Sequence, residues 1–108
     1  MSGWESKQIG HYLDYEMVPV DDVVNKQCYI LKCETDRIEN EEGDTILVHF
    51  LVHLIDDNKT FEVRTGAKPI VRTITTMTPQ AIKELIDKKE ITSFIKERTP
   101  KGFTYKMI

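Results

Sequence analysis

The chain has few cysteines and no long apolar run. Its 108 residues include two cysteines, Cys28 and Cys33. Two cysteines do not make a disulfide framework, so we interpret them as reduced thiols. The longest apolar stretch, residues 46–55, is interrupted by two histidines and is too short to span a bilayer. Residues 1–16 lack the apolar core of a signal peptide, and we therefore expect a cytoplasmic protein that does not insert into a membrane.

Glycine is also scarce, with five in the chain, and this bears on the stretch TGAKPIVR at residues 65–72. A nucleotide-binding loop needs a second glycine, a Lys-Ser/Thr pair and a helix start, none of which occurs here. Pro69 also disfavours a helix at the residue before it. We interpret the stretch as a bend at Gly66 whose cations can track a nucleic-acid backbone by neutralising phosphates, and a solvated basic turn is the alternative. The three cations that this bend brings close together are Arg64, Lys68 and Arg72.

No catalytic constellation is present in the sequence. It contains no Gly-x-Ser-x-Gly motif, no His-Glu-x-x-His motif and no paired carboxylates in an apolar setting. The acidic turn ENEEGD, residues 39–44, does not follow the spacing of a calcium-binding EF-hand loop. We therefore expect a protein that is not an enzyme and has no cofactor.

One metal template is matched loosely. Cys28 and Cys33, followed by His49 and His53, have spacings that fall within a zinc-site pattern. We interpret the histidines as lying on a strand, where four residues separate them by roughly 13 Å, too far to share one ion. The two cysteines are expected on opposite faces of an extended strand. Zinc binding would become feasible if the histidine segment were helical instead.

Charge is divided unevenly along the chain. Residues 1–58 carry 13 acidic and 4 basic side chains, whereas residues 59–108 carry 5 acidic and 11 basic ones. Such asymmetry is typical of proteins with an anionic partner. The alternative is that the two halves attract each other within the fold.

The apolar patterns predict three strands, a helix and two further strands in one domain. A short helical turn is expected after Pro19, and Thr78 followed by Pro79 predicts the start of the helix. The sequence does not decide between a strand and a loop for residues 67–77, because the threonines favour a strand and the position after Gly66 favours a loop. The predicted strands cover residues 27–35, 45–55, 60–64, 91–98 and 103–108, and the predicted helix ends at Lys89.

This order matches the OB-fold, a five-stranded Greek-key barrel with a helix between its third and fourth strands. We predict an OB-fold-like domain over residues 27–108, mainly β with one helix, preceded by an N-terminal arm over residues 1–26. A five-stranded antiparallel sheet with one covering helix is the alternative. The barrel is favoured because the run TILVHFLVHLI is apolar on both faces, as suits a curled sheet.

The terminal hairpin mixes cations with aromatic side chains. Basic grooves with stacking aromatics are typical of single-stranded nucleic-acid binders. Because strand residues alternate between faces, Phe103 and Tyr105 share a face and could equally belong to the core. On the long central strand, His49 and His53 lie beside Arg64 on the face where an OB-fold would hold its ligand. The cations of the hairpin are Lys96, Arg98, Lys101 and Lys106.

The run from LKCETDRIENEEGDTILVHFLVHLIDDNKTFEVRTGAKPIVRTI to the closing FTYKMI resembles the small OB-fold single-stranded DNA-binding proteins of phages and mobile elements. The resemblance covers about residues 20–108 and rests on a long first hairpin, a Thr-Gly-Ala-Lys step, a helix and a short final hairpin. It implies binding of single strands without strong sequence preference, in replication or recombination. One departure is the first hairpin's turn, whose acids would repel phosphates.

The predicted function is therefore non-enzymatic binding of single-stranded nucleic acid. The alternative is a protein–protein interaction module, encoded by a phage or mobile element, that uses the acidic half of the chain. A replication or host protein and a second copy of the chain remain open as further partners. The predicted phosphate contacts are Arg64, Lys68, Arg72, Lys96, Arg98 and Lys101, and the predicted base contacts are His49, His53 and Tyr105.

Overall fold

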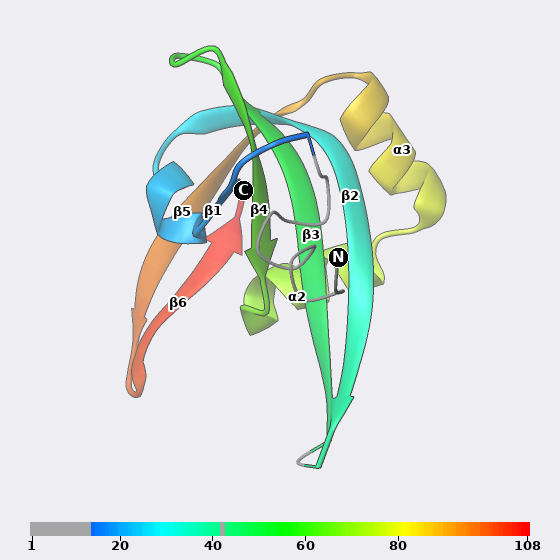
Figure 1. Cartoon of the computed structure of the whole chain (residues 1–108), viewed down its shortest axis with the longest axis vertical. Coiled ribbons are helices and arrows are strands. Elements are labelled where there is room, and N and C mark those ends of the chain that lie inside the picture. Colours follow the sequence, from blue (N-terminus) through cyan, green and yellow to red (C-terminus); the bar gives the residue numbers. More distant parts are fainter. Residues whose placement is uncertain (1–13, 42) are drawn as a thin grey trace.

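The computed structural model describes residues 14–41 and 43–108, and these residues form mostly strands (Figure 1). A six-stranded sheet, ordered β1-β4-β3-β2-β5-β6, curls into a half-barrel, and two helices lie between β4 and β5. In chain order the elements are β1 (Met17–Val18), the 3₁₀ helix η1 (Val20–Val23), β2 (Gln27–Asn40), β3 (Gly43–Leu54), β4 (Lys59–Thr65), α2 (Lys68–Thr76), α3 (Pro79–Asp87), β5 (Ile91–Thr99) and β6 (Gly102–Met107).

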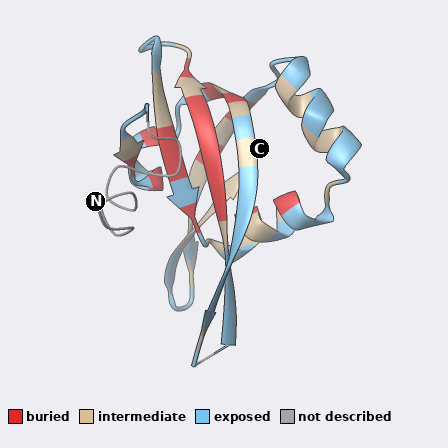
Figure 2. Ribbon diagram, turned by 45° about the vertical axis from the view of Figure 1, so that its right-hand side comes forward, coloured by how far each residue is buried: buried red, intermediate tan, exposed pale blue. Residues whose placement is uncertain are grey.

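Strands β2, β3 and β4 form the predicted antiparallel meander. The prediction that the central strand is covered on both sides is confirmed, because residues 48–52 of β3 are all buried. One side faces the hydrophobic core through Val48, Phe50 and Val52, and we call it the inner face. The outer face is the opposite side, which carries His49, Leu51 and their neighbours on β2 and β4. Buried residues are concentrated in the middle of the sheet (Figure 2).

The expectation that Cys28 and Cys33 lie on opposite faces of their strand is wrong. The register of β2 against β3 shifts between Ile30 and Lys32, which is the signature of a β-bulge. In a regular strand, residues five positions apart point to opposite faces. The extra residue of the bulge shifts the alternation by one position, so both thiols point to the core. The shift also lets the strand bend, which helps the sheet to curl.

The second half of the chain confirms the predicted helix and terminal hairpin. Helix α3 begins at Pro79, and the hydroxyl of Thr78 accepts a hydrogen bond from the backbone N–H of Ala81 at 3.1 Å. Strands β5 and β6 then pair antiparallel. Phe94 of β5 is fully buried and meets Phe50 edge to face, with ring centroids 5.3 Å apart. This contact fixes the base of the terminal hairpin to the inner face of β3.

Residues 68–76 form helix α2, which neither the strand nor the loop reading of this segment anticipated. Pro69 is tolerated because it lies in the first turn, where the backbone N–H has no helical partner to lose. Ile70 and Ile74, four residues apart, share one helix face and are buried in the core. Helix α2 packs against β6 and β3, so Ile70 and Ile74 join the core beside these two strands.

Part of the predicted N-terminal arm joins the sheet and core, and residues 1–13 lie outside the described residues. The predicted helical turn after Pro19 is confirmed as η1. Strand β1 runs parallel to β4, and Val20 and Val23 of η1 are buried in the core. Neither helix in the described part of the chain is long and apolar enough to cross a membrane.

The predicted order of three strands, helical segment and two strands is present, with β1, η1 and α2 added to it. Strand β5 pairs back with β2, so the chain crosses over the meander before it forms the terminal hairpin. Among the described strands, β6 lies at one edge of the sheet and does not pair with β4. The 3₁₀ helix η1 contacts β4 and β5 across this opening.

Helix α2 should contribute to stability through its buried stripe. Replacing Ile70 by alanine leaves a cavity in the core and should lower the free energy of unfolding by about 2–5 kcal/mol in urea denaturation. Arg72→Ala, an exposed change on the same helix, should shift it by no more than about 0.5 kcal/mol. Equal effects of the two substitutions would contradict the packing of α2.

Candidate nucleic-acid interface

The terminal hairpin of β5 and β6, which we call the basic hairpin, extends beyond the core (Figure 1). Its register pairs Lys96 with Tyr105 and Arg98 with Phe103. Because every second residue of a strand points to the same side, these four side chains lie on the face of Phe94 and continue the inner face outward. Phe94 is buried, whereas Phe103 is 63% exposed. Of the two aromatic residues that could be either core or stacking platform, Tyr105 is partly buried and packs against the core, whereas Phe103 lies at the exposed end.

The cation and the aromatic rings of this face are in direct contact. The Lys96 ammonium lies 4.6 Å from the centroid of the Phe103 ring and 5.8 Å from that of Tyr105. At these distances the cation is attracted to the negative face of the rings. The contact orders a long, flexible side chain and leaves a flat aromatic surface beside a positive charge, the combination on which a nucleic-acid base and its phosphate can bind.

A carboxylate from the N-terminal segment already occupies part of this cluster. The Tyr105 hydroxyl donates a hydrogen bond of 2.7 Å to Asp21 Oδ1, and the Lys96 ammonium lies 3.5 Å from the same oxygen. Asp21 belongs to η1, 84 positions away from Tyr105, and sequence reasoning missed it. No local pattern connects the two residues, because the contact depends on how η1 crosses the open side of the half-barrel.

The contact shifts the pKa of both of its partners. The hydrogen bond from Tyr105, followed by the charge of Lys96, lowers the pKa of Asp21 below 3.8. The same hydrogen bond raises the pKa of Tyr105 above 10.0. Since the carboxylate is the bonded form, the contact stabilises the fold above pH 3.8 and is lost as the pH falls through the lowered pKa. Near neutral pH this cluster therefore holds an anion.

The remaining predicted cations divide between two places. Lys101 is exposed in the turn of the basic hairpin, next to the Arg98–Phe103 pair. Lys68 and Arg72 are exposed on α2, four residues apart on one stripe, and α2 packs against β6. Lys106 points to the other side of the hairpin, where it pairs with Glu97 at 2.6 Å. The basic hairpin thus has one face with aromatic rings and cations and another with a neutralised ion pair.

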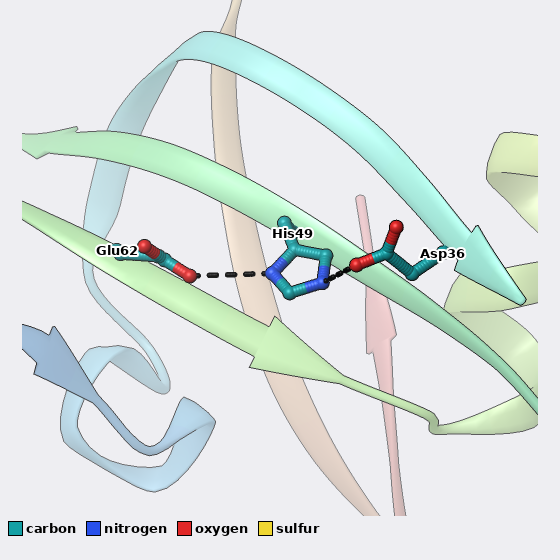
Figure 3. A network of polar contacts seen from close by, with 3 residues as sticks. All are labelled: Asp36, His49 and Glu62. Atoms are coloured by element: carbon teal, nitrogen blue, oxygen red, sulfur yellow. Dashed lines mark hydrogen bonds and ion pairs between the residues drawn. The ribbon is translucent and has the colours of Figure 1, made fainter. Parts of the chain in front are cut away.

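The outer face of the central strands is built differently, around a histidine between two carboxylates (Figure 3). His49 Nδ1 lies 3.2 Å from Glu62 Oε2, and its Nε2 lies 2.7 Å from Asp36 Oδ2. His49 is 3% exposed and Glu62 is fully buried. These contacts join β2, β3 and β4 across the outer face. The burial leaves His49 little surface with which to contact a base, so the interface does not rest on it.

The two other predicted contacts on the outer face, His53 and Arg64, are not part of the same surface as the basic hairpin. The ring of His53 is half-buried, stacks on Tyr29 and forms hydrogen bonds to Thr60 and Asn58. Arg64 is exposed on β4 opposite His49, whereas the other two cations of the Gly66 bend, Lys68 and Arg72, lie on helix α2. The predicted set is therefore divided between the outer face, α2 and the inner face of the basic hairpin.

The four residues of the zinc pattern are divided between the two faces of the sheet. Cys28 and Cys33 point to the inner face, and His49 and His53 point to the outer face. Within residues 14–41 and 43–108 no group of three or more potential ligands is placed to hold a metal ion. The thiols instead lie in or against the core, where Cys28 donates a hydrogen bond to the backbone carbonyl of Thr92. The imidazoles interact with neighbouring side chains, as His53 does with Thr60.

Comparison with known proteins adds no relative. No protein-family model matches this sequence, and no curated protein or solved structure matches it either. We therefore infer the function from the geometry of the fold and the chemistry of the basic hairpin.

The two thiols should be slow to react in the folded protein. Burial raises the pKa of Cys28 to about 11, and burial together with the charge of Glu34 raises that of Cys33 to about 11. Since the thiolate is the reactive form, its fraction at pH 8 falls about 100-fold relative to a thiol of ordinary pKa. We expect slow modification by Ellman's reagent in buffer and fast modification in urea. Fast reaction of both thiols in buffer would contradict their placement in the core.

Proposed function

We propose that this chain is a non-enzymatic module that binds single-stranded nucleic acid, most readily single-stranded DNA during replication or recombination, through the inner face of the basic hairpin. The observation that carries the proposal is the Lys96 ammonium held over the exposed Phe103 ring, beside Tyr105. Stacking on an aromatic ring accepts any base, and the neighbouring cations neutralise phosphates. The stacking contact favours single strands, whose bases are free to unstack.

The fold supports an OB-fold-like assignment. A three-stranded meander, a helical segment and a terminal hairpin whose first strand pairs back with the first meander strand reproduce the OB-fold order. The half-barrel differs from a closed barrel because, among the described strands, β6 does not pair with β4. In OB-folds, ligands contact the central strands and the hairpin loops. Because the outer face around His49 is buried here, we place the proposed contact on the basic hairpin instead.

The Asp21 carboxylate offers further support. It lies where Lys96 and Tyr105 can hold an anionic oxygen, at 3.5 Å and 2.7 Å. A phosphate oxygen carries the same charge and accepts the same hydrogen bonds. We propose that a backbone phosphate replaces Asp21 at this position while a base stacks on Phe103.

The proposal is tested by fluorescence anisotropy with a labelled oligo-dT of roughly thirty nucleotides, titrated with the full chain across a salt series. If the three cations Lys96, Arg98 and Lys101 each neutralise one phosphate, the logarithm of the affinity should fall with the logarithm of salt with a slope of about −2. An absence of binding at low salt would falsify the proposal.

A pair of variants then locates the binding surface on the hairpin. Arg98→Ala removes a cation from the aromatic face, and Lys106→Ala removes one from the opposite face of the same two strands. Arg98→Ala should weaken binding and make the salt slope shallower by about 0.7, whereas Lys106→Ala should change both much less. Phe103→Ala should weaken binding roughly 5- to 150-fold at any salt concentration, since it removes a stacking platform. Equal losses for Arg98→Ala and Lys106→Ala would show that only net charge matters.

Removing the internal carboxylate should have the opposite effect. In Asp21→Asn the cluster no longer holds its own anion, so oligo-dT should bind a few-fold more tightly in the same titration. Asp22→Asn changes the net charge equally. Asp22 is exposed beside Asp21, but the contacts to Tyr105 and Lys96 are made by Asp21. The difference between the two variants isolates the local effect. If both variants bind alike, Asp21 does not compete with the nucleic acid.

A further inference from the structure

The hairpin of β2 and β3 extends beyond the core as an acidic arm, residues 34–46. All of its described side chains are exposed. The sequence of the arm holds six acidic residues and one basic residue. A two-stranded ribbon without a core beneath it is marginally stable in water, so an arm of this length gains from a partner that covers it.

The inner face of the arm combines acidic and apolar groups. Strand alternation places Glu39, Asp44 and Ile46 on this face, and Arg37 lies beside them in an ion pair of 2.6 Å with Asp44. Ile46 is 37% exposed although it is a large aliphatic residue. A partner for this face should therefore carry cations next to an exposed apolar side chain.

The same chain carries such a surface. The basic hairpin holds four basic residues and one acidic residue between positions 96 and 106, and its inner face exposes Phe103 between cations. The arm and the basic hairpin project from the same end of the half-barrel, as both ribbon views show (Figures 1 and 2). Each of the two elements thus matches the other in charge and in apolar content.

We propose that two copies of this chain form a two-fold symmetric dimer in which the acidic arm of each copy binds the basic hairpin of the other. A two-fold axis that passes between the two elements, perpendicular to the direction in which they project, brings both contacts together at once. In each contact the two ribbons run in opposite directions and meet near their tips, where Glu39 faces the Arg98–Lys101 end of the partner's hairpin. Because both hairpins are covered, the dimer and bound nucleic acid exclude each other.

The dimer itself does not depend on the proposed function, whereas the competition with nucleic acid rests on it. Self-association is therefore measured first, without nucleic acid, by sedimentation velocity of the full chain over a concentration series. We expect the mass to double with concentration at low salt and the dimer to weaken at high salt, because screening acts on the charge pairs. A wild-type chain that stays monomeric at low salt and high concentration overturns the proposal.

A charge exchange tests which surfaces meet. The arm variant Glu39→Lys/Glu41→Lys and the hairpin variant Arg98→Glu/Lys101→Glu should each lose the dimer, with an association constant at least roughly tenfold weaker. A mixture of the two should form a heterodimer, since each arm then meets a hairpin of opposite charge. If the mixture does not associate, or if either variant alone dimerises like the wild type, the arm and the hairpin are not the contact.

A matched control and a competition complete the test. Asp56→Lys/Asp57→Lys makes the same charge change in the β3–β4 turn at the other end of the molecule, and its dimer should match that of the wild type. Oligo-dT should convert the wild-type dimer to a monomer–DNA complex. A dimer that forms but does not respond to oligo-dT would leave the self-association standing and count against the nucleic-acid function.

Discussion

The double burial of β3 determines which surface of this molecule is left for a partner. On its inner face, Phe50 meets Phe94 and fixes the curl of the sheet around the core. On its outer face, His49 lies between Glu62 and Asp36, so that side-chain polar contacts link the three central strands there. A buried carboxylate is stable only with such partners, and this network therefore constrains the outer face as firmly as the core constrains the inner one. The part of each hairpin that extends past the core remains accessible.

The two extensions differ in charge because the chain divides its acids and bases between them. The first long hairpin lies in the acidic half of the sequence, and the terminal hairpin lies in the basic half. The curl of the sheet brings both to one end of the molecule (Figure 1). The uneven charge of the sequence had two interpretations, attraction between the two halves of the chain and attraction to an anionic partner. In the structure both interpretations involve the cations of the basic hairpin. Asp21 gives a small example within one chain, since it holds Lys96 and Tyr105 as an external anion would.

The sequence predicted the long-range order of the fold better than its details. The alternation of apolar and polar residues, with the turn residues between the strands, was enough to predict the meander. Thr78 followed by Pro79 was enough to predict the start of α3. Helix α2 was missed because its threonines and Pro69 favour other local structures, while its buried stripe of Ile70 and Ile74 stabilises the helix only once the core is present. Strand β1 is two residues long and has no periodic signal, and the bulge in β2 is set by pairing rather than by residue type.

For the candidate site, the residue types were predictable and their grouping was not. The pairing of Lys96 with Tyr105 and of Arg98 with Phe103 follows from the hairpin register, which the TPKG turn implies. By contrast, no pattern in the sequence shows that His49 is buried between carboxylates, or that Lys68 and Arg72 lie on a helix. These facts depend on contacts between distant segments.

The proposed binding of single strands to the inner face of the basic hairpin can be followed residue by residue. Its most direct test is the perturbation of backbone amide resonances when oligo-dT is added to the isotopically labelled chain at low salt. We expect the largest shifts at residues 96–105 and near Asp21, whose carboxylate is displaced. Shifts concentrated instead at His53, Glu62 and Arg64 would place the ligand on the outer face and contradict the account.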